Sequence, residues 1–109
     1  RKALEALRRA TRKTDLTPAQ LGAALSRVIN IQPKRLQDPE FALELGKRLE
    51  TGGATGPEQW YLVGQAYQIN SLNTEARAAM LQALGQINAA RGDRAKLRSE
   101  IQESLLAIR

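Results

Sequence analysis

Three of the prolines directly follow residues that commonly cap helices. These three pairs divide the chain into segments of helix length. The three pairs are Thr17-Pro18, Asp38-Pro39 and Gly56-Pro57. Proline suits the first helical position because the N–H that it lacks would be unpaired there anyway. Gln20 stands where a capping box needs Gln or Glu, and Glu40 places an acid in a first turn, where the helix dipole favours it. The sequence therefore predicts that helices begin at these three points.

Apolar residues between the breakers recur every three or four positions, which is typical of amphipathic helices. No segment alternates with the period of a strand. The breakers are Gln32-Pro33, the glycine-rich stretch 51–56 and Arg91-Gly92-Asp93. We therefore predict an all-α protein of six helices, over about 1–13, 17–30, 38–50, 57–69, 73–90 and 93–108.

Length and composition narrow the class of protein further. The 109 residues suggest one helical domain over 1–109, large enough to bury a core without cross-links. There is no Cys and no His, which excludes disulfides, thiol nucleophiles and the usual zinc ligands. No apolar run is long enough to span a bilayer. Both ends lie inside helical patterns, so we expect a piece of a longer protein, and the compartment stays open between cytoplasm and periplasm.

One segment gathers the large side chains around a glycine. Trp60, Val63, Gly64 and Tyr67 share one face of a predicted helix, and Ala76, Met80 and Ala83 share one face of the next. Glycine inside a helix costs about 1 kcal/mol relative to alanine, so its presence needs a packing reason. We predict that the second helix crosses closely at Gly64 near Ala76, with large side chains around the crossing.

This spacing resembles the tetratricopeptide repeat, which reads Trp-x2-Leu-Gly-x2-Tyr and then Ala-x3-Phe. Residues 57–90 match well, with Val63 in place of Leu and Met80 in place of Phe, although Asn88 stands near the usual closing Pro. Residues 18–50 match weakly. The resemblance implies antiparallel hairpins in a superhelical stack, with 93–109 as a capping helix. An unrelated six-helix bundle is the alternative.

In that family the first helix of each repeat lines a concave groove that holds a peptide or a partner helix. The resemblance implies exposed groove positions at Glu58, Tyr61, Gln65, Gln68 and Ile69, and in the weaker repeat at Ala19, Gly22, Ser26, Ile29 and Asn30. Tyr61 is the best candidate anchor, because amphipathic aromatics are enriched at binding hot spots. It could equally cover the edge of the core. The implied function is a protein–protein interaction scaffold. The Ala- and Arg-rich composition suggests a bacterial source, and for such a source the resemblance implies a role in an assembly or secretion system.

Nucleic-acid binding is the main alternative function. The formal net charge is +6, and a basic patch is expected at Arg8, Arg9, Arg12 and Lys13. Such a patch would contact phosphates weakly and without sequence preference. A helix-turn-helix over residues 16–49 is disfavoured, because its second helix opens with the acids Asp38 and Glu40, which phosphates would repel.

Catalysis has little support in the sequence. The nearest approach to a carboxylate cluster is Asp15, Asp38, Glu40 and Glu44, and two of these are expected to serve helix starts. The general bases and nucleophiles that enzymes commonly use are not arranged together. We therefore expect a protein that is not an enzyme and that holds no cofactor or metal.

Overall fold

The computed structural model describes residues 2–11, 16–31, 37–52, 56–89 and 95–108. Within these ranges the chain forms helices and no strand, so the predicted all-α class is confirmed. The six described helices are α1 (Lys2–Thr11), α2 (Pro18–Ile29), α3 (Pro39–Thr51), α4 (Pro57–Ile69), α5 (Asn73–Ala89) and α6 (Ala95–Ala107). The segment predicted over 57–69 is α4, and the other segments end close to the observed helix ends.

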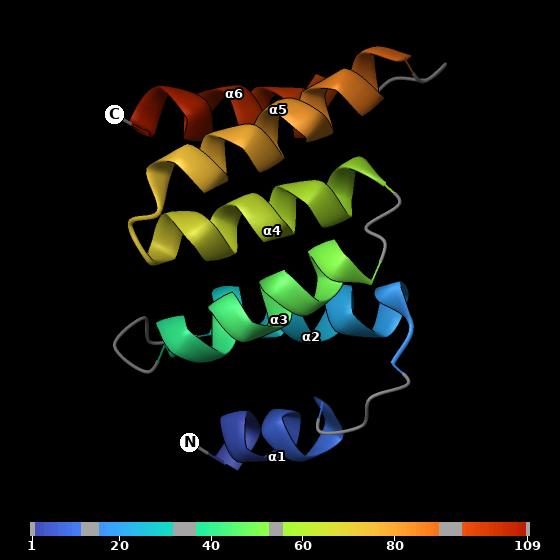
Figure 1. Ribbon diagram of the computed structural model, residues 1–109, viewed down its shortest axis with the longest axis vertical. Helices are drawn as coiled ribbons and strands as arrows, with labels where there is room; N and C mark the ends of the chain where they lie inside the picture. Colours follow the sequence, from blue (N-terminus) through green and yellow to red (C-terminus); the bar gives the residue numbers. More distant parts are fainter. Residues whose placement is uncertain (1, 12–15, 32–36, 53–55, 90–94, 109) are drawn as a thin grey trace.

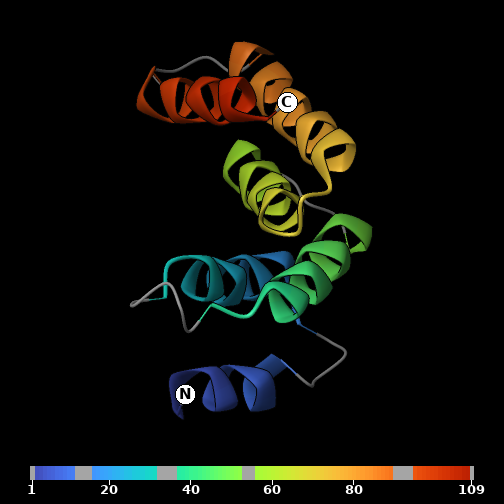
Figure 2. The ribbon, with the colours of Figure 1, turned by 90° about the vertical axis from the view of Figure 1, so that its left-hand side faces the viewer.

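The helices are stacked along the longest axis of the molecule, from α1 at one end to α5 and α6 at the other (Figure 1). Each helix packs on the next one in the chain, and α2 also contacts α4. Seen from the side, α2 and α6 lie on one side, α3 and α5 on the other, and α4 between them (Figure 2). The result is an elongated body of 38 × 29 × 22 Å.

The predicted helix starts at Thr17 and Asp38 are confirmed in detail. The Thr17 hydroxyl accepts from the Gln20 backbone N–H at 3.2 Å, and the Thr17 N–H donates to the Gln20 side chain at 2.9 Å. Asp38 accepts from the Phe41 N–H at 3.1 Å. These bonds satisfy donors that a helix start would otherwise leave unpaired, so the entry points of α2 and α3 are fixed by local chemistry.

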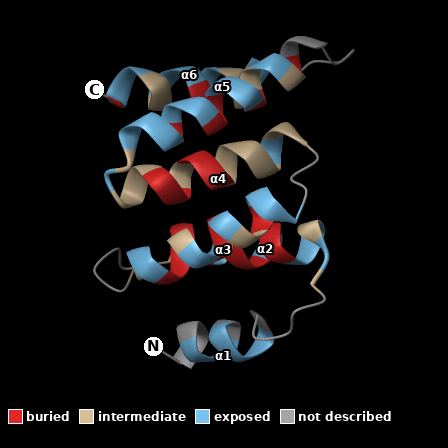
Figure 3. Cartoon of the chain, in the orientation of Figure 1, coloured by how far each residue is buried: buried red, intermediate tan, exposed pale blue. Residues whose placement is uncertain are grey.

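One continuous core runs through α2 to α6 (Figure 3). Its fully buried large side chains include Leu25 of α2, Leu45 and Leu49 of α3, Met80 of α5 and Ile101 of α6. In α1, by contrast, the described side chains are exposed. The described part of the core is therefore built by α2 to α6.

Arg8 joins α1 to the start of α3. Its guanidinium forms an ion pair with Asp38 and lies 4.5 Å from the centre of the Phe41 ring. Burial acts to raise the pKa of the Asp38 carboxyl, but the Phe41 N–H and the Arg8 guanidinium outweigh it, so the pKa is lowered. The same carboxylate thus caps α3 and holds α1.

The connection between α4 and α5 is a tight turn. The Leu72 N–H donates to the Tyr67 carbonyl at 3.0 Å, and Ser71 takes a left-handed backbone conformation with φ of 60°. The Asn70 side chain donates to the Ala66 carbonyl at 2.8 Å and to the Pro39 carbonyl at 2.9 Å. This turn brings α5 back against α4 and links the end of α4 to the start of α3.

Candidate functional site

The crossing of α4 and α5 depends on the missing side chain of Gly64. A Cβ atom at this position would lie 2.7 Å from Met80 Cγ and 3.3 Å from the Ala76 carbonyl oxygen. Real Cβ atoms do not approach other heavy atoms as closely as the first of these distances. The residues around the contact are buried, namely Val63, Tyr67, Ala76, Met80 and Ala83. The two backbones can therefore approach only because residue 64 has no side chain.

Trp60 lies at the edge of this packing rather than inside it. Its side chain packs against the core but is only half-buried. Its indole Nε1 is shielded from solvent and has no hydrogen-bond partner in the described part of the chain. Trp60 also lines an open cleft.

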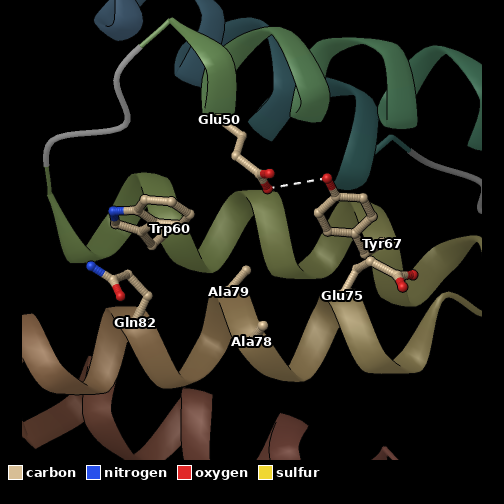
Figure 4. Close-up of a pocket in the computed structure, with 7 residues that line it drawn as sticks. All are labelled: Glu50, Trp60, Tyr67, Glu75, Ala78, Ala79 and Gln82. Atoms are coloured by element: carbon tan, nitrogen blue, oxygen red, sulfur yellow. Dashed lines mark hydrogen bonds between the residues drawn. The ribbon is translucent and has the colours of Figure 1, made fainter.

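The cleft has a volume of about 290 Å³ and lies where α3, α4 and α5 meet (Figure 4). Trp60 and Tyr67 of α4 stand on either side of it, and Glu50 reaches over it from the end of α3. The α5 side is formed by the small residues Ala78 and Ala79 between the polar residues Glu75 and Gln82. The cleft is thus lined by two aromatic rings, two carboxylates and the methyl groups of the alanines.

The carboxylates shape the electrostatics of the cleft. The Tyr67 hydroxyl donates to the Glu50 carboxylate at 3.1 Å. Burial, the bond to Glu50 and the negative charges of Glu50 and Glu75 together raise the pKa of Tyr67 to about 12. Neither carboxylate forms an ion pair with a cation from the described residues. The cleft is therefore locally negative on a chain whose formal net charge is +6.

Sequence reasoning missed this cleft. Glu50 closes one helix and Glu75 opens another, and each position has an ordinary explanation as an exposed helix-end residue. The two meet Trp60 only because α3 and α5 pack on α4 from two sides. No spacing in the sequence connects these residues, so no pattern in one chain could have grouped them.

The residues expected to line a groove have mixed environments. Tyr61, Gln65, Gln68 and Ile69 of α4 are half-buried, and Glu58 is exposed. The Tyr61 hydroxyl lies 3.1 Å from the Ser104 hydroxyl of α6, within hydrogen-bond distance. The proposed anchor is therefore already in contact with another helix of the same chain.

The weaker hairpin contributes less to that surface than expected. Ser26 is half-buried and Asn30 is exposed, but the Asn30 side chain donates to the Ser26 carbonyl at 2.9 Å. The expectation that Gly22 and Ile29 are exposed is wrong, because both are buried. A Cβ on Gly22 would lie 3.9 Å from Leu62 of α4, so direct packing of α2 on α4 covers this position.

The basic patch is only partly described. Arg8 is paired with Asp38, while Arg9 is exposed. Arg12 and Lys13 lie outside the described residues. Among the residues that the structure describes, no group of His, Cys, Asp and Glu side chains is arranged to hold a metal ion. No helix in the described ranges combines the length and apolar character that crossing a membrane requires.

Comparisons of the chain with protein-family models, with curated proteins and with solved structures found no match.

Proposed function

We propose that the protein is a helical scaffold of the tetratricopeptide type, which binds a segment of another protein and catalyses no reaction. The observation that carries this proposal is the crossing at Gly64. The repeat pattern requires a small residue there, and a Cβ atom at this position would force Met80 to shift. The packing of each helix on the next one in the chain is also what a stack of helical hairpins needs.

The partner segment would lie along the side formed by α2 and α4. The half-buried polar and apolar groups Gln65, Gln68 and Ile69 would supply hydrogen bonds and contact area. Because the Tyr61 hydroxyl lies beside Ser104, Tyr61 would act mainly by positioning α6 next to this surface. We therefore assign the primary contacts to Gln65 and Gln68 rather than to Tyr61.

Site-directed photo-crosslinking in source cells tests this surface. A photoreactive amino acid is placed at Gln68 of α4, and a matched variant carries it at Gln102, an exposed glutamine of α6. The scaffold function predicts a discrete protein adduct from position 68 that is weak or absent from position 102. Circular dichroism of both purified variants verifies that the helices are retained.

A second arm measures whether the surface contributes to affinity. Gln65→Ala should weaken capture of the crosslinked protein, whereas Gln102→Ala should not. If position 68 gives no adduct above that of position 102 in folded protein, the surface formed by α2 and α4 is not the binding site. If adducts contain nucleic acid and no protein, the basic first helix becomes the better candidate.

A further inference from the structure

We propose that the cleft between α3, α4 and α5 binds the guanidinium group of an arginine residue in a partner polypeptide. The site is separate from the proposed scaffold surface, because it uses the sides of α4 that face α3 and α5 rather than α2. It does not depend on the tetratricopeptide assignment.

The negative charge of the two carboxylates favours a cationic ligand. Glu50 and Glu75 both line the cleft, and in the described part of the chain neither is neutralised by an ion pair. Tyr67 donates one hydrogen bond to Glu50, which leaves further lone pairs on that carboxylate to accept others. A positively charged donor that enters the cleft would meet acceptors that are already positioned.

The aromatic wall favours a guanidinium over an ammonium. Trp offers the best π-face for a cation, and Trp60 borders the cleft opposite Tyr67 (Figure 4). A guanidinium is planar, stacks on aromatic faces and can form two parallel hydrogen bonds with a carboxylate. The methyl groups of Ala78 and Ala79 leave space for a flat group between the rings.

The size and position of the cleft favour a side chain of a polypeptide. About 290 Å³ lies at the lower limit for sites that enclose a drug-sized ligand, which is adequate for one long side chain. Glu50, Glu75 and Gln82 are exposed at its rim. A polypeptide can therefore run across the surface while one arginine reaches inward to Trp60.

Two-dimensional NMR with capped peptides tests the proposal directly. Acetyl-Gly-Arg-Gly-amide is titrated into the 15N-labelled protein, and the indole N–H of Trp60 and the amides of Ala78 and Ala79 are followed. Trp60 is the only Trp, so its indole signal is unambiguous. We expect saturable shifts at these positions with a dissociation constant on the order of 1 mM, as one side-chain contact would give.

Two control peptides isolate the charge and the shape. The citrulline peptide keeps the planar shape without the charge, and we expect it to bind at least about fivefold more weakly. The lysine peptide keeps the charge but lacks the planar group, and we expect its affinity to lie between those of the arginine and citrulline peptides. Equal binding of the arginine and citrulline peptides would overturn the site as a cation site. A lysine peptide that binds as tightly as the arginine peptide would overturn the guanidinium assignment.

Variants locate the contact on the protein. Glu50→Gln and Glu75→Gln should each weaken the arginine peptide about threefold to tenfold, whereas Glu44→Gln, an exposed position on α3 that does not line the cleft, should not. Glu75 is exposed, so its variant decides the question if Glu50→Gln disturbs the fold. Arginine binding that is unchanged by Glu75→Gln, or absent from the wild type, refutes the proposal.

Discussion

Helix α4 meets its two neighbours in the chain through two glycine contacts that differ in kind. Against α5, Gly64 lies under the flexible side chain of Met80 and beside the Ala76 carbonyl. Against α3, the glycine is on the other helix, and a Cβ on Gly46 would lie 2.9 Å from the Ala66 Cβ. The first contact involves a side chain that can turn, while the second sets two rigid Cβ positions against each other. Close helix approach is thus achieved twice, once beneath a long side chain and once against a methyl group.

The largest expected effect is at the first contact. Gly64→Leu should lower the free energy of unfolding by about 2–4 kcal/mol, because the new side chain overpacks a site whose neighbours are fully buried. Helix propensity alone predicts the opposite sign, a gain of roughly 1 kcal/mol. Urea unfolding of both proteins measures the difference. A urea midpoint of Gly64→Leu that equals or exceeds that of the wild type would contradict the close crossing of α4 and α5.

The contact between α3 and α4 has a second component that depends on pH. The pKa of Tyr67 is raised to about 12, so the neutral phenol is favoured in the folded state. Its contribution is fully present below the unfolded value near 10 and is lost as the pH rises from about 10 to about 12. We expect a loss of about 1–2 kcal/mol, less than the full shift implies because Glu50 is exposed to solvent.

A variant without the hydroxyl isolates this component. Tyr67→Phe should be less stable than the wild type at pH 8, and the difference should shrink by pH 12. Urea unfolding at the two pH values, with the wild type measured in parallel, cancels the titration of the other groups. A difference between the two proteins that does not change with pH would show that the bond to Glu50 does not stabilise the interface.

A substitution at Gly46 is expected to lower the free energy of unfolding less than Gly64→Leu does. Gly46→Ala should destabilise by about 1 kcal/mol, since overpacking against Ala66 exceeds the gain in helix propensity. Adding Ala66→Gly to this variant exchanges the two residues across the interface. A double-mutant cycle should give a favourable coupling of about 0.5–1 kcal/mol. Strictly additive effects would mean that the two positions do not meet.

The smallest effect is expected at Gly22, where α2 packs on α4. A Cβ there would lie 3.8 Å from Gln59 and 3.9 Å from Leu62, which are ordinary contact distances. Gly22→Ala should therefore be neutral or stabilising by a few tenths of a kcal/mol, as added contact and helix propensity act together. Thermal unfolding is sensitive enough for this comparison. A clear loss of stability would mean that α2 and α4 pack more tightly than the distances indicate.

The parts of the fold that could be predicted are those set by local chemistry. The Thr17 capping box, the Asp38 cap and the periodic apolar residues fixed the helices, because each acts within a few residues. The crossing at Gly64 was anticipated since glycine inside a helix needs a reason. Gly46 is also a glycine inside a helix, but it does not lie in the tetratricopeptide spacing, so its close contact with Ala66 is not predicted from the sequence.

The parts that could not be predicted depend on how helices are placed against each other. Gly22 and Ile29 were assigned to an exposed surface by position in a repeat, and the direct packing of α2 on α4 buries them. The acidic cleft needs Glu50 and Glu75 from two helices that meet only across α4. Both depend on the crossings of the helices, about which periodicity within one helix carries no information.

One matched pair of variants tests the close crossing of α4 and α5 most directly. Gly64→Ala and Gly85→Ala make the same change in neighbouring helices, and a Cβ on Gly85 would meet nothing within 4 Å. Gly85→Ala should stabilise by about 0.5–1 kcal/mol through helix propensity. Gly64→Ala should destabilise by about 1 kcal/mol, so urea unfolding should separate the pair by about 2 kcal/mol. If both variants are stabilised to the same extent, the helices do not cross at Gly64, and the scaffold assignment loses its main support.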